Sequence, residues 1–563
     1  MKTSLRIYCI LATVICLCSC GRETISTDVL VVGGGTAGSI AAVQSARAGS
    51  STVLVEAGGA LGGTTTTGGV SFPGLFHAWG RQVIGGIGWE LVSAAVEMDG
   101  GEMPDFTVPF GTDHPRHQIH INPNIYSMLA EEACLDAGVE IRYYEFPTAV
   151  RRVRGGWAVD LCGKGGTDIC IRCRQLVDCT GNADVVAKAG FARLRGENTA
   201  AAAGSVRMHG NGRFASRSYG HRDDARMQGN GSGTGSGSGS SRQEQGNSNA
   251  SGRGRRQDAS DGRIGVRMHG NGRFASRSYG HRDDARMQGN GSSSGSSRQE
   301  QGNSNASGRG RRQAEMYSAE TQPGSLIFQL GGYDLAAVNF AAVDSAMAQA
   351  RADGRLQPED CYTSAAFLLS DRPGLAVSHV LGADSSTSVA HSAANIAGRT
   401  SLLRLVRFLR TLPGLEGLTV TSMQSETAIR ETYRIDGLYT ITVDDYVSGR
   451  IFDDAVAYSF YPIDLHDAAG VEPRHLENGA VATIPFRALI PRGSRNMLVA
   501  GRCVSSDRNA NSALRVQASC MAMGQAAGAA AALCSRMGIT PAELSADTLR
   551  TFLREHGAII PER

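Results

Sequence analysis

The stretch Asp28–Ala42, DVLVVGGGTAGSIAA, joins an apolar run, a glycine turn and the start of a helix. The continuous apolar run Val29–Val32 is typical of a central parallel strand that is covered on both faces. The glycines follow the pattern G-x-G-x-x-G: Gly33 permits a tight turn, Gly35 lets a pyrophosphate approach the backbone, and Gly38 lets helix and strand pack closely. Because a helix N-terminus attracts phosphates, this arrangement predicts a nucleotide-binding turn.

The next strand narrows the choice of nucleotide. The segment STVLVE ends at Glu56, whose carboxylate can accept hydrogen bonds from ribose hydroxyls and would repel a 2′-phosphate, which disfavours NADP. A ligand-free glycine turn is the alternative. Three further segments read as strand or loop next to glycine, namely LGGTTTTGG, VDCTGNADVV and LVAGRCVSS. Segments so far apart in the sequence suit one long ligand, such as FAD, better than NAD.

Together these segments resemble the bacterial FAD-dependent oxidoreductase family, which has a glutathione-reductase-type FAD fold and is related to fumarate reductase flavoproteins. The resemblance covers most of 27–200 and 320–560 and is carried by DVLVVGGGTAGSIAAVQSARAG, LVEAGGALGGTTTTGGV, VDCTGNADVVAKAG, IRETYRIDGLYTITVDDYVSGRIFDDAVAYSFYPIDLHD and IPFRALIPRGSRNMLVAGRCVSSDRNANSALRVQASCMAMGQAAG. It implies an α/β protein with a discontinuous Rossmann-like FAD-binding domain and a second substrate domain. The expected divisions are an FAD domain at 27–73, 126–200 and 490–536, a substrate domain at 74–125 and 315–489, and a helical tail at 537–563.

The resemblance also implies which residues hold FAD. Those expected at the pyrophosphate are Gly33, Gly35, Gly38, Thr180 and Gly181. Glu56 is expected at the adenosine ribose. Those expected along the ribityl chain and flavin are Gly62, Gly63, Thr64, Gly501 and Arg502. Finally, Ala513 and Leu514 are expected to begin a long helix, from about Ser512, whose N-terminus stabilises negative charge on the reduced flavin.

One segment, 201–314, departs from this pattern. Residues 206–231 recur unchanged at 266–291, and 240–257 recur at 296–313, within a region rich in Gly, Ser and Arg. With almost no aliphatic residues to bury, 201–314 is predicted to be a disordered, duplicated insertion. Binding of an anionic polymer through its arginines is the functional alternative, and a gene duplication or sequence artefact is another. No specific nucleic-acid partner is expected.

The N-terminus, MKTSLRIYCILATVICLCSCG, has a basic start, a short apolar run and small residues before Cys20. This is typical of a secretory signal, and LCSC resembles a bacterial lipobox. We expect a signal segment at 1–20 and an exported protein that is lipid-anchored in the cell envelope through Cys20. An uncleaved anchor is the alternative, although the apolar run is short for a membrane span.

Few residues can supply the proton chemistry that a flavin needs. His466, next to Asp467, is a plausible general base, with a structural hydrogen-bonded histidine as the alternative. His77 could reach the flavin face, or it could be a packed loop histidine. The arginines expected to clamp a carboxylate or polarise a carbonyl, with salt bridges as the alternative, are Arg430, Arg508 and Arg515.

No metal site is expected: HPRHQIH at 114–120 lacks a carboxylate partner, and the two cysteines of CIRC at 170–173 should lie on opposite faces of a strand. The predicted function is transfer of a hydride between a small-molecule substrate and FAD, with an electron acceptor that the sequence does not specify. The alternatives are FAD chemistry without net redox, as in an isomerase or lyase, and a non-enzymatic polymer-binding protein.

Overall fold

The computed structural model describes residues 23–108, 113–166, 168–197, 321–372, 374–467 and 470–562. All of these residues belong to one compact unit. The predicted signal segment 1–20, the lipidation site Cys20 and the predicted insertion 201–314 lie outside the described residues.

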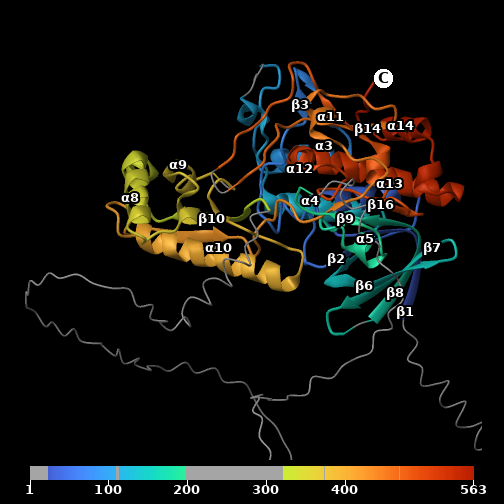
Figure 1. Ribbon diagram of the computed structural model, residues 1–563, viewed down its shortest axis with the longest axis horizontal. Coiled ribbons are helices and arrows are strands. Elements are labelled where there is room, and N and C mark those ends of the chain that lie inside the picture. Colours follow the sequence, from blue (N-terminus) through green and yellow to red (C-terminus); the bar gives the residue numbers. More distant parts are fainter. Residues whose placement is uncertain are drawn as a thin grey trace, which may run out of the picture. The chain divides into compact units, whose positions relative to one another are not determined.

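A seven-stranded sheet organises one part of the structure and combines strands from both ends of the chain (Figure 1). Its order is β5-β2-β1-β8-β7-β6, and β16 pairs with the second half of β8. Strands β5, β2, β1, β8 and β16 run parallel, whereas β7 pairs antiparallel with both β8 and β6. The bounds are β1 Glu23–Val32, β2 Thr52–Glu56, β5 Glu140–Tyr143, β6 Glu145–Val153, β7 Gly156–Gly163, β8 Asp168–Asp178 and β16 Met497–Val499.

Strand β1 is covered on both faces, as its apolar run predicts. Val29 and Val31 belong to one hydrophobic core and Leu30 and Val32 to another, and all four side chains are buried. The alternation follows from the two-residue period of a strand. The predicted α/β, Rossmann-like fold class is confirmed by this sheet and by the helices that pack on it.

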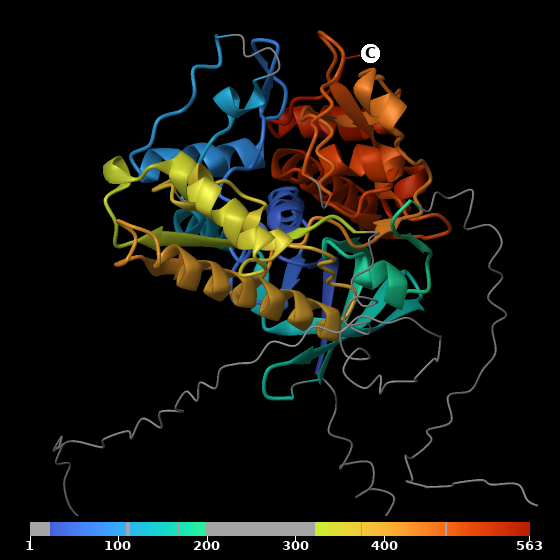
Figure 2. The ribbon, with the colours of Figure 1, turned by 60° about the vertical axis from the view of Figure 1, so that its left-hand side comes forward.

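Helix α2 (Thr36–Arg47) packs on β1 and β2, and the long helix α13 (Gln517–Met537), which is red in Figure 2, packs beside it on β8. The two helices approach closely because α13 carries glycine at the contacts. A Cβ on Gly524 would lie 2.2 Å from the Ala37 carbonyl oxygen, and one on Gly528 would lie 2.3 Å from that of Ala41. The further helices of this part are α3 Ile87–Met98, α4 Pro123–Asp136, α5 Asp184–Lys188, α11 Val443–Val447, α12 Arg508–Leu514 and α14 Ala546–Glu555.

A smaller antiparallel sheet, in the order β11-β10-β12, has its own hydrophobic core. The helices of this region, coloured yellow to orange in Figure 1, contribute most of the remaining core residues. The bounds are β10 Gly324–Gly331, β11 Val377–Val380, β12 Thr419–Met423, α8 Phe340–Ala352, α9 Ala365–Leu368 and α10 Ser388–Leu409. The remaining strands form pairs: β3 His77–Ala78 with β4 Arg81–Gln82, β9 Arg193–Leu194 with β13 Arg434–Ile435, and β14 Ala455–Ser459 with β15 Ala482–Pro485.

The prediction of one long C-terminal helix from about Ser512 is wrong. Helix α12 ends at Leu514, and α13 begins at Gln517 after Val516 takes an extended conformation with ψ 142°. Ala513 and Leu514 therefore end a short helix instead of beginning the long one. The chain changes direction here because Arg515 turns back to contact Asp464, whose backbone carbonyl and carboxylate both accept from its guanidinium.

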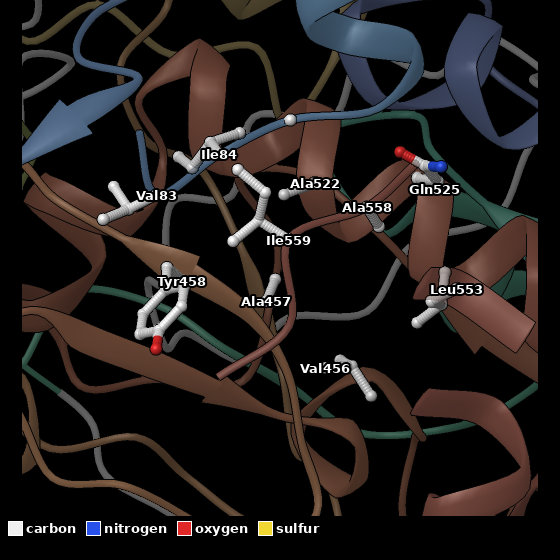
Figure 3. A pocket seen from close by; sticks show the side chains of 11 residues that line it. Val83, Ile84, Val456, Ala457, Tyr458, Ala522, Gln525, Leu553, Ala558 and Ile559 are labelled. Carbon is white, nitrogen blue, oxygen red and sulfur yellow. The ribbon is translucent and has the colours of Figure 1, made fainter. Parts of the chain in front are cut away.

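A small cavity lies between β14, α13 and the C-terminal segment (Figure 3). Ile84, Ala457, Ala522 and Ile559 line it with apolar groups, and the amide of Gln525 lies at one side. Its volume of about 10 Å³ is at the lower limit for one water molecule. It is a packing defect of the core and too small for a substrate.

Candidate functional site

The glycine turn between β1 and α2 has the geometry that its sequence predicts. Gly33 has φ +97°, a left-handed conformation that favours glycine. A Cβ on Gly38 would lie 1.7 Å from the Gly33 carbonyl oxygen, so only glycine fits there. At Gly35 the nearest neighbour of such a Cβ, the Gly63 Cα atom, is 3.8 Å away. Gly33 and Gly38 thus serve the packing of the protein, whereas the space beside Gly35 is open to a ligand.

The carboxylate of Glu56 stands at the end of β2, beside this turn. Its Oε2 atom accepts a hydrogen bond from the Gly34 amide at 2.6 Å, and its Oε1 atom accepts from the Gly58 amide at 2.6 Å. Burial raises the pKa of Glu56 in spite of these two hydrogen bonds. Each carboxylate oxygen keeps a further lone pair, so the predicted acceptance of ribose hydroxyls is compatible with this position.

The loop that carries Gly62, Gly63 and Thr64 packs directly on the turn. The Gly62 amide donates to the Gly34 carbonyl at 2.9 Å, and the Thr36 hydroxyl donates to the Gly62 carbonyl at 3.1 Å. A Cβ on Gly63 would lie 2.8 Å from the Cα atom of Gly35. Two predicted cofactor segments therefore share one backbone surface.

The two distant cofactor segments also meet here. Thr180 and Gly181 follow β8, and Gly501 and Arg502 follow β16, its neighbour in the sheet. The Arg502 guanidinium donates to the Gly181 carbonyl at 2.9 Å and to the Asn182 side chain at 2.9 Å. A Cβ on Gly501 would lie 3.3 Å from the Ala37 Cβ atom. Because parallel strands end at one edge of the sheet, residues more than 400 positions apart converge on the start of α2.

The start of α13 supplies a residue that the sequence analysis missed. Gln517 is buried, its carbonyl accepts from the Thr65 hydroxyl, and its Nε2 donates to the Val70 carbonyl at 2.9 Å. Ala513 and Leu514, which were predicted there, are fully buried at the end of α12. The sequence signal was available: Gln517 is a polar residue at the start of the alanine-rich helix α13.

These residues fit FAD. No side chain caps the N-terminus of α2, and the open side of Gly35 lies next to it. Glu56, the 62–64 loop and the ends of β8 and β16 surround the same edge of the sheet, which suits a ligand that extends across several strand ends. The individual contacts proposed for each residue stay predictions.

A second group of polar side chains is centred on Asp464. Its Oδ2 atom lies 3.2 Å from His466 Nε2 and 3.2 Å from Arg515 Nη2. The prediction that Asp467 partners His466 is wrong, since the carboxylate in hydrogen-bond range is that of Asp464, two residues before the histidine. Burial alone would raise the pKa of Asp464, but the His466 hydrogen bond and the Arg515 charge hold it below its usual range.

His466 is held as a neutral imidazole with one free nitrogen. Burial lowers its pKa, and the charges of Arg430 and Arg515 act in the same direction, although the Asp464 hydrogen bond opposes them. A carboxylate can only accept, so the proton of the neutral ring sits on Nε2. The Nδ1 atom is buried and has no hydrogen-bond partner among the described residues. It therefore offers a lone pair to a bound molecule.

Three further residues complete this group, and only one of them was predicted. His379, on β11, stacks on the ring of Tyr362 with centroids 4.0 Å apart, and its ring centroid lies 5.9 Å from that of His466. Arg430 Nη2 lies 3.4 Å from His379 Nε2. Burial lowers the pKa of His379 to about 2, so its ring is neutral. Burial also lowers the pKa of Arg430 to about 10, and the guanidinium stays charged at neutral pH.

Arg508 takes the salt-bridge role that was weighed against catalysis. Its guanidinium donates to Glu431 at 2.9 Å and to Glu197 at 2.8 Å, so two carboxylates already engage it. Glu431 also accepts from the amide of Gln322 at 2.7 Å. The side-chain carbonyl of Gln322 in turn accepts a hydrogen bond from the backbone amide of His466 at 3.1 Å. Arg508 thus supports the His466 loop through Glu431 and Gln322.

His77 lies in a different environment, an aromatic cluster. Its ring stacks on Phe106 with centroids 3.7 Å apart and meets Trp89 edge-on. Burial lowers its pKa to about 4. The structure does not bring it together with His466 and Arg430, and the packed-histidine alternative describes it better.

The neighbouring histidines point to different partners, since His114 contacts Tyr461 and His120 contacts Phe72. Within the described residues no group of three His, Cys, Asp or Glu side chains could hold a metal ion.

The Asp464 group adjoins the cofactor segments. The Asp464 amide donates to the Ser512 hydroxyl at 3.0 Å, and the thiol of Cys520, in the first turn of α13, contacts the Arg515 carbonyl. Gln517 lies between Ser512 and Cys520 in the sequence, and its side-chain carbonyl accepts a hydrogen bond from Thr65, in the loop that follows Gly63. His466 and Arg515 are therefore placed next to the end of the cofactor site predicted to hold the flavin.

Comparison with known proteins identifies the family. Parts of the chain are similar to solved structures. Anhydrotetracycline hydroxylase OxyS of Streptomyces rimosus is 21% identical over 30% of this chain and 35% of its own, with a TM-score of 0.20. For p-nitrophenol 4-monooxygenase PnpA of Pseudomonas putida DLL-E4 the identity is 17%, the coverage 31% of this chain and 44% of its own, and the TM-score 0.20, and for THI4 of Thermovibrio ammonificans the identity is 18%, the coverage 35% of this chain and 75% of its own, and the TM-score 0.23. The chain spans less than half the length of the first two. No curated protein matches. The sequence profile of the FAD dependent oxidoreductase family matches residues 28–553. The chain therefore belongs to the FAD dependent oxidoreductase family, which confirms the predicted family and its FAD cofactor.

Proposed function

We propose that this protein oxidises or reduces a small molecule by hydride transfer at FAD, with His466 as the proton-transferring residue. The observation that carries the proposal is the free, buried Nδ1 atom of a neutral His466 whose other nitrogen is bound to Asp464. Bound FAD supplies the two-electron hydride chemistry. The chain's own residues must bind the substrate, orient it and move a proton.

In the oxidising direction, His466 Nδ1 accepts the proton of the substrate group next to the carbon that loses hydride. Asp464 keeps the imidazole in the required tautomer and stabilises the imidazolium that forms. Burial of Asp464, His466 and Arg430 limits competition from water for the same proton. Loss of one hydride and one proton gives a two-electron oxidised product, and the reverse sequence gives reduction.

The experiment is anaerobic titration of the purified protein with small-molecule substrates while the flavin absorbance is followed. The proposal expects bound FAD and bleaching by a substrate, with bleaching slowed in His466→Gln at unchanged FAD content. A colourless protein that cannot be loaded with FAD would refute the function itself. A protein that is bleached equally fast with His466→Gln would remove only the role of the histidine.

We further propose that the chain is exported and held at the membrane by a lipid on Cys20, and that it is related to fumarate reductase flavoproteins. The support for the location is the signal-like pattern of residues 1–20. Within the described parts of the chain, no helix is long and apolar enough to cross a membrane. Mass spectrometry of the N-terminus tests the location: an intact, unlipidated signal segment contradicts it.

A further inference from the structure

The contacts around Asp464 join two guanidinium groups to one carboxylate, an excess of one positive charge among these three side chains, while the Asp467 carboxylate acts on Tyr362. The guanidinium groups are those of Arg430 and Arg515, and Asp464 is the carboxylate that pairs with Arg515. Among the described residues no carboxylate lies in ion-pair range of Arg430, whose guanidinium contacts the Pro323 carbonyl and His379. The two histidines of the site are neutral because burial lowers the pKa of each.

The polar atoms left without partners lie in the same place. Buried atoms of three side chains have no hydrogen-bond partner among the described residues: Arg515 Nε, the Tyr362 hydroxyl and His466 Nδ1. The interaction networks tie them together, since Tyr362 stacks on His379, His379 contacts Arg430, and Arg515 shares Asp464 with His466. Leaving such groups unsatisfied costs free energy, so a ligand that partners them gains affinity.

We propose that Arg430 and Arg515 bind the carboxylate of an anionic substrate, with the Tyr362 hydroxyl as an additional donor. This inference rests on the proposed function and names the substrate class of the same site. A planar carboxylate matches the geometry of guanidinium donors. Its single charge balances the single excess positive charge, whereas a phosphate dianion would leave the buried site negative.

The same geometry limits how far the reacting group of the substrate lies from its carboxylate. The side chains of Arg515 and His466 are adjacent, since Arg515 Nη2 and His466 Nε2 each lie 3.2 Å from one oxygen of Asp464. Among the described residues, each side chain keeps one buried atom without a partner, Arg515 Nε and His466 Nδ1. The substrate class is therefore a carboxylic acid that gives up its proton close to its carboxylate.

The test uses the FAD-loaded protein and small anions as probes. Acetate, propionate, uncharged propionamide and inorganic phosphate are titrated separately while the flavin difference spectrum is recorded. We expect a saturable perturbation with acetate or propionate and none with propionamide. Arg430→Gln and Arg515→Gln should each weaken carboxylate binding about tenfold or more, whereas Arg399→Gln, on the exposed side of α10, should leave it unchanged.

Each outcome decides the proposal. FAD-loaded protein that responds to neither carboxylate, or responds equally in the two arginine variants, overturns it, and tighter binding of phosphate overturns the carboxylate assignment. Should both arginine variants fail to fold or to hold FAD, Tyr362→Phe decides, because it removes only a hydroxyl: carboxylate binding about threefold weaker supports the proposal, and unchanged binding contradicts it. Absence of FAD from the wild-type protein is a different result, which refutes the proposed function.

Discussion

Replacing Gly38 with alanine tests the packing role assigned to the third glycine of the turn. The new Cβ would lie 1.7 Å from the Gly33 carbonyl oxygen, whereas real Cβ contacts stay above 3.0 Å, so the backbones must separate by about 1.3 Å. Helix α2 cannot retreat, because α13 already packs so closely on it that a Cβ on Gly524 would lie 2.2 Å from the Ala37 carbonyl oxygen. Overpacking of this kind costs about 1–3 kcal/mol, and a backbone clash belongs at the upper end.

Gly35→Ala is the matched control for this change. Its Cβ would meet nothing closer than 3.8 Å, and the backbone angles of φ −70° and ψ −166° suit alanine. Urea denaturation of the apoprotein should show a loss of about 3 kcal/mol for Gly38→Ala and no more than about 1 kcal/mol for Gly35→Ala. FAD titration of Gly35→Ala should show affinity reduced by about tenfold or more, because the methyl group occupies the approach predicted for the pyrophosphate. Equal stabilities, or wild-type FAD affinity in Gly35→Ala, would refute this division of roles.

Three other predictions follow from the site. Asp464→Asn should slow flavin reduction by substrate about 10²-fold or more at unchanged FAD content, because an amide no longer fixes the His466 tautomer; a rate within twofold of wild type contradicts this. Glu56→Gln should weaken FAD binding about tenfold, measured by fluorescence titration, and unaltered affinity would argue against the ribose contact. Burial holds the pKa of His379 at about 2 in the folded protein, so between pH 6.5 and about 2 the unfolded chain binds one more proton at this residue. The free energy of unfolding must therefore fall on acidification, by up to about 1.4 kcal/mol per pH unit. In urea denaturation His379→Gln should reduce this slope, and an identical slope would exclude His379 as its source.

The cofactor side of the site was predictable because its signals are local. The glycines between Gly33 and Gly38 dictate their own turn, and Glu56 ends the strand that pairs directly with β1. Gly501 could be added because strand ends next to glycine recur at one edge of a parallel sheet. Four strands of the main sheet, β1, β2, β8 and β16, accordingly come from segments that the sequence indicated.

The substrate side was harder to predict because it depends on tertiary contacts. His379 belongs to a short strand whose sequence shows nothing of Arg430, 51 residues away. Asp464, and not Asp467, is the hydrogen-bond partner of His466, because the local path of the chain places the Oδ2 atom of Asp464 next to the imidazole. The break before Gln517 was missed because Ser512–Met537 is rich in small helix-forming residues. The tertiary contact of Arg515 with Asp464 overrides that propensity.

The central claim is most directly tested by measuring the flavin content of the purified full-length chain. Denaturation should release FAD, identified by mass spectrometry, in an amount equimolar with the protein, and Gly35→Ala should release much less after identical purification. Protein that contains no FAD and takes up none on incubation with it would contradict the assignment of this site.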